Sequence, residues 1–212
     1  MIDTEERARH WLRELPSYDA EREGKLDAFS QMLVLESARQ NLVAQASLPQ
    51  LWRRHIADSA QLMCHVPRET ATWLDLGTGA GFPGLIVAIL SPEVQVTLVE
   101  SRTKRASWLS ACIEALGIAN ARVWHGDVKA LMAARFDVIS ARAFAPLDRL
   151  LALAARFSTG DTTWALPKGR SAREELAELR GWRHTFHVEQ SLTEPAAGII
   201  TGHLLGPEGQ RG

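Results

Sequence analysis

Residues 74–84 read LDLGTGAGFPG, which places four glycines and a proline directly behind an apolar run. Glycine gives up side-chain packing and costs chain entropy, so this density is expected only where the backbone turns with positive φ or admits a close ligand. Pro83 suits the first position of a helix, because its missing N–H would have no partner there. The stretch therefore predicts a strand, a ligand-binding loop and a helix at the edge of an open α/β sheet.

From Thr72 onward, short apolar runs alternate with helical periods, which predicts a mostly parallel, seven-stranded sheet covered on both faces. Strands are expected at 72–76, 94–100, 121–124, 136–140, 162–166, 183–189 and 198–205, and helices at 83–90, 103–116, 146–157 and 171–180. Before Thr72 the pattern is helical throughout, with Leu26, Phe29 and Leu33 on one face. The expected organisation is a helical N-terminal cap, 1–66, on a Rossmann-like α/β domain, 67–212, forming one compact unit.

Three local signals refine the expected helices. Ser47, with Pro49 two residues later, is typical of an N-cap. Gly117 follows an apolar helical face and suits a C-terminal glycine in the left-handed region. Ser171 and Glu174 form the S-x-x-E pattern of a capping box.

Composition narrows the class of protein. The chain has 212 residues, 46% of them apolar, which is enough for a real core. No apolar run approaches the roughly 18–20 residues of a membrane span, and the start has no apolar leader. Cys64 and Cys112 lie far apart in apolar surroundings, as packed, reduced thiols do. We expect a cytoplasmic protein without membrane or metal, and the net charge of −1 gives no basic field that would indicate nucleic acid.

An acidic residue indicates the ligand of the glycine loop. Glu100 ends the second expected strand, where a carboxylate can accept hydrogen bonds from both hydroxyls of a ribose. Asp127, Val128 and Lys129 follow the third strand, at the end of the cleft where an adenine ring would lie. Together these positions predict an adenosine-containing ligand.

Two adenosine compounds fit the glycines differently. Residues 79–84 spell the G-x-G-x-x-G of dinucleotide enzymes, but counted from the end of the strand that motif requires glycine where Phe82 stands. The G-x-G-x-G register of Gly77, Gly79 and Gly81 instead suits S-adenosylmethionine, which has no pyrophosphate. The sequence favours S-adenosylmethionine over a nicotinamide dinucleotide.

Four segments carry a resemblance to a known family: HIADS (55–59), LDLGTGAGFPG (74–84), ISARAFAPL (139–147) and LPKG (166–169). In this order and spacing the chain resembles the RsmG or GidB family, the bacterial small-subunit ribosomal RNA guanine-N7 methyltransferases. The resemblance implies a class I S-adenosylmethionine-dependent fold and methyl transfer to N7 of a guanine in 16S ribosomal RNA.

The resemblance also implies roles for matching positions. Gly77 and Phe82 would be cofactor contacts, Val128 and Lys129 would lie beside adenine, and Arg142 would bridge the cofactor and substrate sites. Four further residues would line the mouth of the active site: His55, Asp58, Ser59 and Lys168.

The implied chemistry requires little from the protein beyond positioning. Guanine N7 has a lone pair and no proton, so its methylation needs no general base, and orientation supplies the acceleration. We expect no catalytic dyad, no covalent intermediate and no metal. Arg142 and Lys168 would hold a phosphate or the O6 edge of the base. His55 is a third candidate, although it is equally typical of a packed helical histidine, and Phe144 is either a stacking surface or a core residue.

Two other functions remain open at this point: a nicotinamide-dependent oxidoreductase on the same fold, and a non-catalytic RNA binder of ribosome assembly. The near-neutral charge would hold naked RNA weakly, so the expected partner is 16S ribosomal RNA within a small-subunit particle, bound by a monomer.

Overall fold

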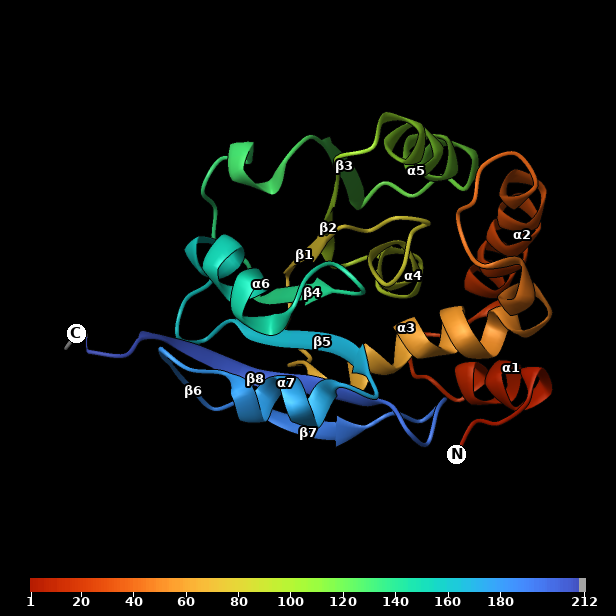
Figure 1. Ribbon diagram of the computed structural model, residues 1–212. Helices are drawn as coiled ribbons and strands as arrows, with labels where there is room; N and C mark the ends of the chain where they lie inside the picture. The colour runs from red at the N-terminus through yellow and green to blue at the C-terminus, as the bar shows by residue number, and fades with distance from the viewer. Residues whose placement is uncertain (210–212) are drawn as a thin grey trace.

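The computed structural model describes residues 1–209, and a single twisted sheet forms its centre (Figure 1). The strands are β1 (Thr72–Leu76), β2 (Gln95–Glu100), β3 (Ala121–His125), β4 (Val138–Ala141), β5 (Thr163–Gly169), β6 (Trp182–His184), β7 (His187–Gln190) and β8 (Gly198–Pro207). Their order is β3-β2-β1-β4-β5-β8-β6, and β7 also pairs with β8. The first five are parallel and β8 is antiparallel to β5, so the expected mostly parallel α/β sheet is confirmed.

The expected strand at 183–189 is wrong as a single element, and the sheet has eight strands instead of seven. The register of β6 against β8 shifts between Arg183 and His184. Opposite this point Gly202 has φ +131°, and a Cβ there would lie 2.8 Å from the Thr185 carbonyl oxygen. The backbones therefore approach closely at an irregular point that interrupts the ladder, and alternation in the sequence does not reveal it.

Helices cover both faces of the sheet. These are α4 (Gly84–Leu90), α5 (Thr103–Ala115), α6 (Leu147–Ala154) with the 3₁₀ turn η5 (Ala155–Phe157), and α7 (Ala172–Glu178). Figure 1 shows α4 and α5 toward the N-terminal helices, and α6 and α7 on the opposite side. Neighbouring strand residues alternate accordingly: Trp73 joins the core cluster under α4 and α5, and Leu74 joins the one under α6.

The N-terminal segment is helical, as expected, but irregular after α1 (Glu5–Arg13) and α2 (Ala20–Ser37). A continuous run follows, comprising η1 (Gln45–Gln50), the π-helical η2 (Trp52–Ala57), α3 (Asp58–Ala60) and η3 (Gln61–His65). The Ser47 N-cap is wrong, because Ser47 lies inside η1 and its hydroxyl donates to the Ala44 carbonyl at 2.6 Å. The Glu5 carboxylate of α1 instead accepts the first two amides of η2.

Two other local expectations have different outcomes. Gly117 has φ +59° and ends α5 as expected. The Ser171–Glu174 capping box is wrong, because Ser171 already has helical angles and its hydroxyl donates to Glu175 at 2.7 Å.

Both cysteines are free, but only Cys112 is packed, since Cys64 is exposed. Within residues 1–209, no helix is both long and apolar enough to cross a membrane.

A buried carboxylate fixes the geometry around the glycine loop. Asp75 in β1 is fully buried, and its two oxygens accept from the Gly84 N–H at 3.0 Å and from the Ser140 hydroxyl at 2.7 Å. Trp73 donates to the same hydroxyl at 2.8 Å. Burial raises the pKa of Asp75 to about 6, and its hydrogen bonds oppose that shift. Asp75 thus connects the start of α4, which follows the glycine loop, to the neighbouring strand β4.

Gly84 is the position at which this arrangement tolerates no side chain. A Cβ there would lie 2.4 Å from the Leu98 side chain and 2.7 Å from Asp75 Cβ. Gly84→Ala should therefore destabilise the fold by roughly 1–3 kcal/mol in chemical denaturation. Gly24→Ala is the matched control, because Gly24 is an exposed α2 position with nothing within 4 Å, and alanine should stabilise it by about 0.4–1 kcal/mol. Equal stability of the two variants would contradict the close packing of α4 on β1 and β2.

Candidate active site

Two cavities open at the carboxyl ends of the parallel strands. The β1–β3 cavity, of about 340 Å³, is lined by strand ends and by the loops after them, including Gly77, Ser101, Asp127, Val128, Lys129 and Phe144. The β4–β5 cavity, of about 570 Å³, is lined by residues from the cap, β4, β5 and the β7–β8 loop, including Arg54, Asp58, Arg142, Phe144, Lys168 and Thr193. Both volumes fall in the range of small-ligand sites.

The segment 142–146 separates the two cavities, because Phe144 and Ala145 line both. The half-buried ring of Phe144 lies over Gly77, where a Cβ would meet its Cδ2 at 2.5 Å. Ala143 has φ +50°, a conformation that side chains other than glycine rarely adopt. Phe144 is therefore a wall residue between the cavities and does not open α6 as a buried core residue.

Glu100 lies at the end of β2, between Val99 and Ser101, which both line the β1–β3 cavity. The residue is 5% exposed, and its carboxylate accepts from the Gly79 N–H at 3.0 Å and from the Arg102 N–H at 2.8 Å. Each carboxylate oxygen keeps a second lone pair. Glu100 thus holds the glycine loop, and it is not itself one of the residues that line the cavity.

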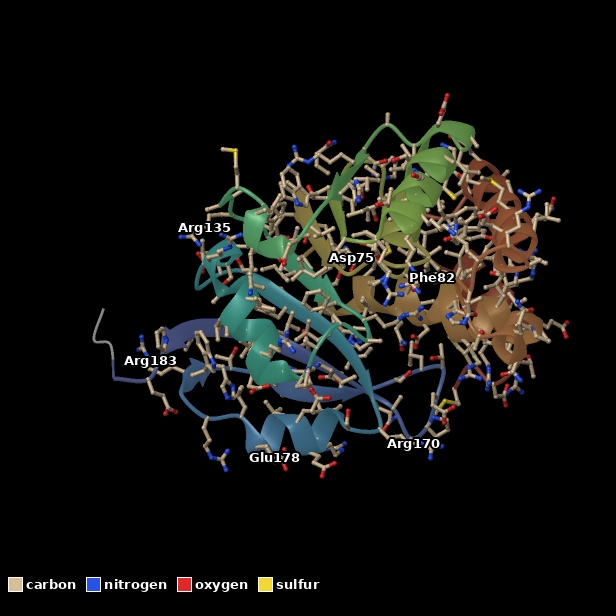
Figure 2. All side chains as sticks on the ribbon, turned by 45° about the horizontal axis from the view of Figure 1, so that its top comes forward. Asp75, Phe82, Arg135, Arg170, Glu178 and Arg183 are labelled. Atoms are coloured by element: carbon tan, nitrogen blue, oxygen red, sulfur yellow. The ribbon has the colours of Figure 1, made fainter. Side chains whose placement is uncertain are left out.

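The other glycine-loop residues have different places. Gly77 (φ +67°) lines the β1–β3 cavity, whereas Gly79 and Gly81 shape the turn behind it with φ of +62° and +116°. The Phe82 side chain is 2% exposed and lines neither of the two cavities. Figure 2 shows Phe82 and Asp75 in the interior of the molecule.

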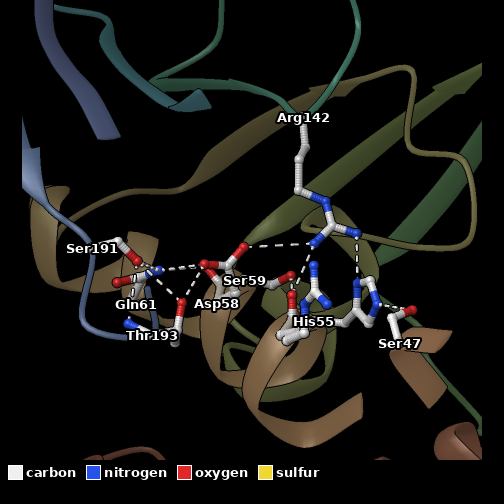
Figure 3. Close-up of polar contacts among 9 residues, drawn as sticks. Ser47, His55, Asp58, Ser59, Gln61, Arg142, Ser191 and Thr193 are labelled. Carbon is white, nitrogen blue, oxygen red and sulfur yellow. Dashed lines mark hydrogen bonds and ion pairs between the residues drawn. The ribbon is translucent and has the colours of Figure 1, made fainter. Parts of the chain in front are cut away.

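Phe82 instead supports the two charged or polar side chains above it. The His55 ring stacks on it, with centroids 5.1 Å apart and an interplanar angle of 24°. Arg142, which follows β4, has its Cζ 4.9 Å from the centre of the same ring. One Arg142 nitrogen lies 3.1 Å from His55 Nδ1, and another lies 3.6 Å from Asp58 (Figure 3).

His55 is a neutral hydrogen-bonding residue in this arrangement. Burial, followed by the charges of Arg142 and Arg54, lowers the pKa of His55 to about 3. A guanidinium can only donate, so His55 Nδ1 accepts from Arg142 and Nε2 carries the proton toward the Ser47 hydroxyl, 2.9 Å away. The geometry makes His55 an acceptor that orients Arg142.

Asp58 connects the cap to the C-terminal part of the sheet. One of its oxygens accepts from Gln61 at 2.8 Å and from Thr193 at 2.7 Å, and the other faces Arg142 (Figure 3). Gln61 is fully buried and also accepts from the Leu192 N–H at 2.7 Å. Ser59 lies outside this network, since its hydroxyl donates to the His55 carbonyl at 2.6 Å.

Lys168 lies across the β4–β5 cavity from the cap and is equally anchored. Its ammonium group, on a side chain 8% exposed, donates to the Ala145 carbonyl at 2.7 Å and pairs with Glu175 at 2.8 Å. Glu175 also accepts from the Ser171 hydroxyl and the Leu147 N–H. Burial raises the pKa of Glu175, but the hydrogen bond and charge of Lys168, together with these two hydrogen bonds, lower it overall. Lys168 thus holds the wall segment as well as contributing charge to the cavity.

Asp127, Val128 and Lys129 all line the β1–β3 cavity. The Asp127 carboxylate accepts from the Lys129 N–H at 2.8 Å, so it caps its own turn. In the described part of the chain, no three His, Cys, Asp or Glu side chains are grouped to hold a metal ion.

The sequence did not predict three residues that support the site: Glu175, Gln61 and Thr193. Glu175 carried a usable signal, because it stands four residues after Ser171 on a helix and can reach the same hydroxyl. Gln61 and Thr193 carried none, because they meet Asp58 only through contacts between distant segments.

Comparison with solved structures places the fold. The cofactor-bound Rv0187 from MTB matches with a TM-score of 0.62 at 15% identity, covering 92% of this chain and 94% of that one. The mitomycin 7-O-methyltransferase MmcR matches with a TM-score of 0.61 at 15% identity, covering 94% and 72%. A mutant MtNAS in complex with S-adenosylmethionine matches with a TM-score of 0.57 at 17% identity, covering 94% and 83%. At these identities the likeness confirms the expected class I fold.

Comparison with protein families and curated proteins is more specific. The family described as "GidB: rRNA small subunit methyltransferase G" matches residues 22–197. The ribosomal RNA small subunit methyltransferase G of Novosphingobium aromaticivorans is 54% identical over 206 residues, covering 95% of this chain and 89% of that protein. The protein of the same name from Erythrobacter litoralis is 54% identical over 203 residues, covering 95% and 97%. The expected relationship is confirmed, and the chain belongs to the rRNA small subunit methyltransferase G family.

Proposed function

We propose that this chain transfers a methyl group from S-adenosylmethionine to N7 of a guanine in the 16S ribosomal RNA of the small subunit. Membership of the family makes it a methyltransferase that acts on ribosomal RNA of the small subunit. The observation that carries the proposal is the pair of adjoining cavities: one follows the glycine loop, and the other holds anchored cations. The family match gives no support to the alternative of a nicotinamide-dependent oxidoreductase.

The residues of the β1–β3 cavity suit S-adenosylmethionine. Gly77 has no Cβ to displace the Phe144 ring that lines the cavity, and the 127–129 turn would lie beside the adenine ring. Glu100, between two lining residues, retains lone pairs that would accept from the ribose hydroxyls. When bound, S-adenosylmethionine supplies a methyl group on a positively charged sulfur. Gly79, Gly81 and Phe82 support this site from behind, through the turn and through Arg142.

The β4–β5 cavity suits a guanine and its phosphate. Arg142 is held by His55, Asp58 and the Phe82 ring, so its guanidinium loses little further freedom on binding O6 or a phosphate. The nucleophile N7 needs no base, which agrees with a His55 that stays neutral across physiological pH. The role of the chain is to orient the base toward the wall at Phe144.

We further propose that the substrate is the RNA within a small-subunit particle, because a net charge of −1 attracts naked RNA weakly. The protein would act as a monomer in the cytoplasm, where ribosomal subunits are built. Residues 1–66 would serve as a cap that supplies His55 and Asp58 to a catalytic domain, 67–212.

The function is tested by incubating the purified chain and S-adenosylmethionine with small subunits, and separately with naked 16S RNA, from cells that lack the gene. Mass mapping of nuclease fragments should find one added methyl on guanine, with more transfer to the particle. Strand cleavage by borohydride and aniline should identify it as N7. Cofactor binding without transfer to either RNA would favour the non-catalytic binder, and thermal stabilisation by NAD alone would favour the oxidoreductase.

His55 should act as an acceptor for Arg142 and not as an acid or base. His55→Asn places an oxygen near the Nδ1 position and should keep kcat within about fivefold, whereas His55→Gln leaves Arg142 without this acceptor and should lose about tenfold or more. Both variants lose the stack on Phe82, so each controls for the other. The wild-type rate between pH 5 and 8 should show no inflection from His55, since its pKa of about 3 lies below that window. An inflection near pH 6.5 that both substitutions remove would contradict this role.

Lys168 should serve the substrate side. Lys168→Ala removes a cation from the β4–β5 cavity and releases Ala145, so kcat on the particle should fall about tenfold or more while the cofactor Kd, from calorimetry, stays within about twofold. Lys25→Ala on α2, distant in the fold from both cavities, is the control and should change neither quantity. An equal loss of cofactor affinity and turnover would contradict this role, because Lys168 would then act mainly through Ala145 on the wall that the two cavities share.

A further inference from the structure

The connection from β3 to β4, residues 126–137, contains little regular structure. Parallel strands are usually joined by a crossover of a dozen or more residues that includes an α-helix. Here the only helical element between them is the 3₁₀ turn η4 (Val128–Ala130). Contacts from outside the connection must therefore define its shape, and that shape forms one wall of the β1–β3 cavity.

Arg156 supplies those contacts. Its Nη2 lies 2.6 Å from the Val128 carbonyl oxygen, 3.0 Å from that of Lys129 and 2.8 Å from that of Leu131. These are charge-assisted bonds, stronger than those between neutral groups. Because Nη2 has two protons, the three oxygens share them, which draws the carbonyls of the turn toward one point.

The segment that carries Arg156, residues 155–158, is packed against the core. Arg156 lies in η5, which continues α6, and the adjacent Phe157 is fully buried in the core beneath α6. The Arg156 Cζ lies 4.5 Å from the centre of the Phe157 ring, although the residue as a whole is exposed. The guanidinium is thus held by packing on one side and by carbonyls on the other.

The far end of the connection is hydrogen-bonded to the same segment, residues 155–158. Arg135, labelled at the edge of the molecule in Figure 2, donates to the Arg156 and Ser158 carbonyls, and the Phe136 N–H donates to the Phe157 carbonyl at 3.1 Å. Both ends of the turn therefore depend on residues 155–158. The cavity-lining part is also held by the Glu100 carbonyl, which accepts from the Gly126 N–H at 3.1 Å, and by the buried Val128 side chain. Arg156 is the side chain from outside the connection that hydrogen-bonds to the carbonyls of residues 128–131.

We propose that Arg156 is a positioning residue that holds the 126–131 turn in the shape that selects adenine in the cofactor. The inference rests on the proposed function, because the ligand of this cavity must carry a purine. Adenine presents an acceptor at N1 and a donor at its 6-amino group, and hypoxanthine presents the reverse. A turn of backbone groups distinguishes the two only if it is held in place to within a fraction of an ångström.

The test compares binding of S-adenosylhomocysteine with S-inosylhomocysteine, in which an oxo group replaces the 6-amino group, by calorimetry on the full chain. The wild type should prefer the adenosyl compound by about tenfold or more. Arg156→Ala should weaken binding of the adenosyl compound by about fivefold or more and reduce the preference below about threefold. Arg156→Lys, whose ammonium reaches fewer carbonyls, should give intermediate values and is the variant to use if alanine does not fold.

Arg180→Ala is the matched control, because Arg180 also donates to two backbone carbonyls, those of Ala177 and Leu179, but at the end of α7. Arg180→Ala should lose about as much stability as Arg156→Ala and should keep the wild type's full preference for the adenosyl compound. A merely structural Arg156 would lower the melting temperature and leave the preference unchanged, which would overturn the inference. A wild type that binds both compounds equally would overturn it too. A wild type that binds neither would overturn the proposed function itself, and the inference with it.

Discussion

The buried carboxylate of Asp75 is the constraint on which the site depends. It bonds the first amide of α4 and the Ser140 hydroxyl of β4, so three elements meet at one side chain. Burial raises its pKa to about 6, while its hydrogen bonds to Ser140 and Gly84 oppose that shift and hold the junction. Because β4 is fixed relative to the glycine loop, Arg142 at the end of β4 extends over the Phe82 ring and lines the β4–β5 cavity.

Arg142 is oriented from three directions that are remote in sequence. The cap supplies His55 and Asp58, the glycine loop supplies the Phe82 ring, and Thr193 of the β7–β8 loop fixes Asp58. The cap is therefore part of the candidate active site as well as a cover for the sheet. For a reaction whose nucleophile needs no base, such anchoring of a cation is the chemical contribution that a protein can make.

The same logic governs the wall between the cavities and the turn beside it. Lys168 and Glu175 fix the segment that carries Phe144, and Arg156 fixes the carbonyls of the 128–131 turn. In both places a cation binds backbone carbonyls of a segment that contains little regular structure. Charged side chains that look solvated in the sequence thus hold irregular segments whose shape the function requires.

The sequence by itself determined the order of strands and helices, the glycine loop, Glu100 at the end of β2 and the family, because hydrophobic periodicity and short motifs are local properties. It could not determine that strand 183–189 divides, that Ser47 serves His55 instead of a helix end, or that Phe82 faces Arg142 and not a cavity. Those outcomes depend on contacts between segments far apart in the chain. Only the tertiary structure decided them, since burial and hydrogen-bond partners are set by what packs opposite a residue.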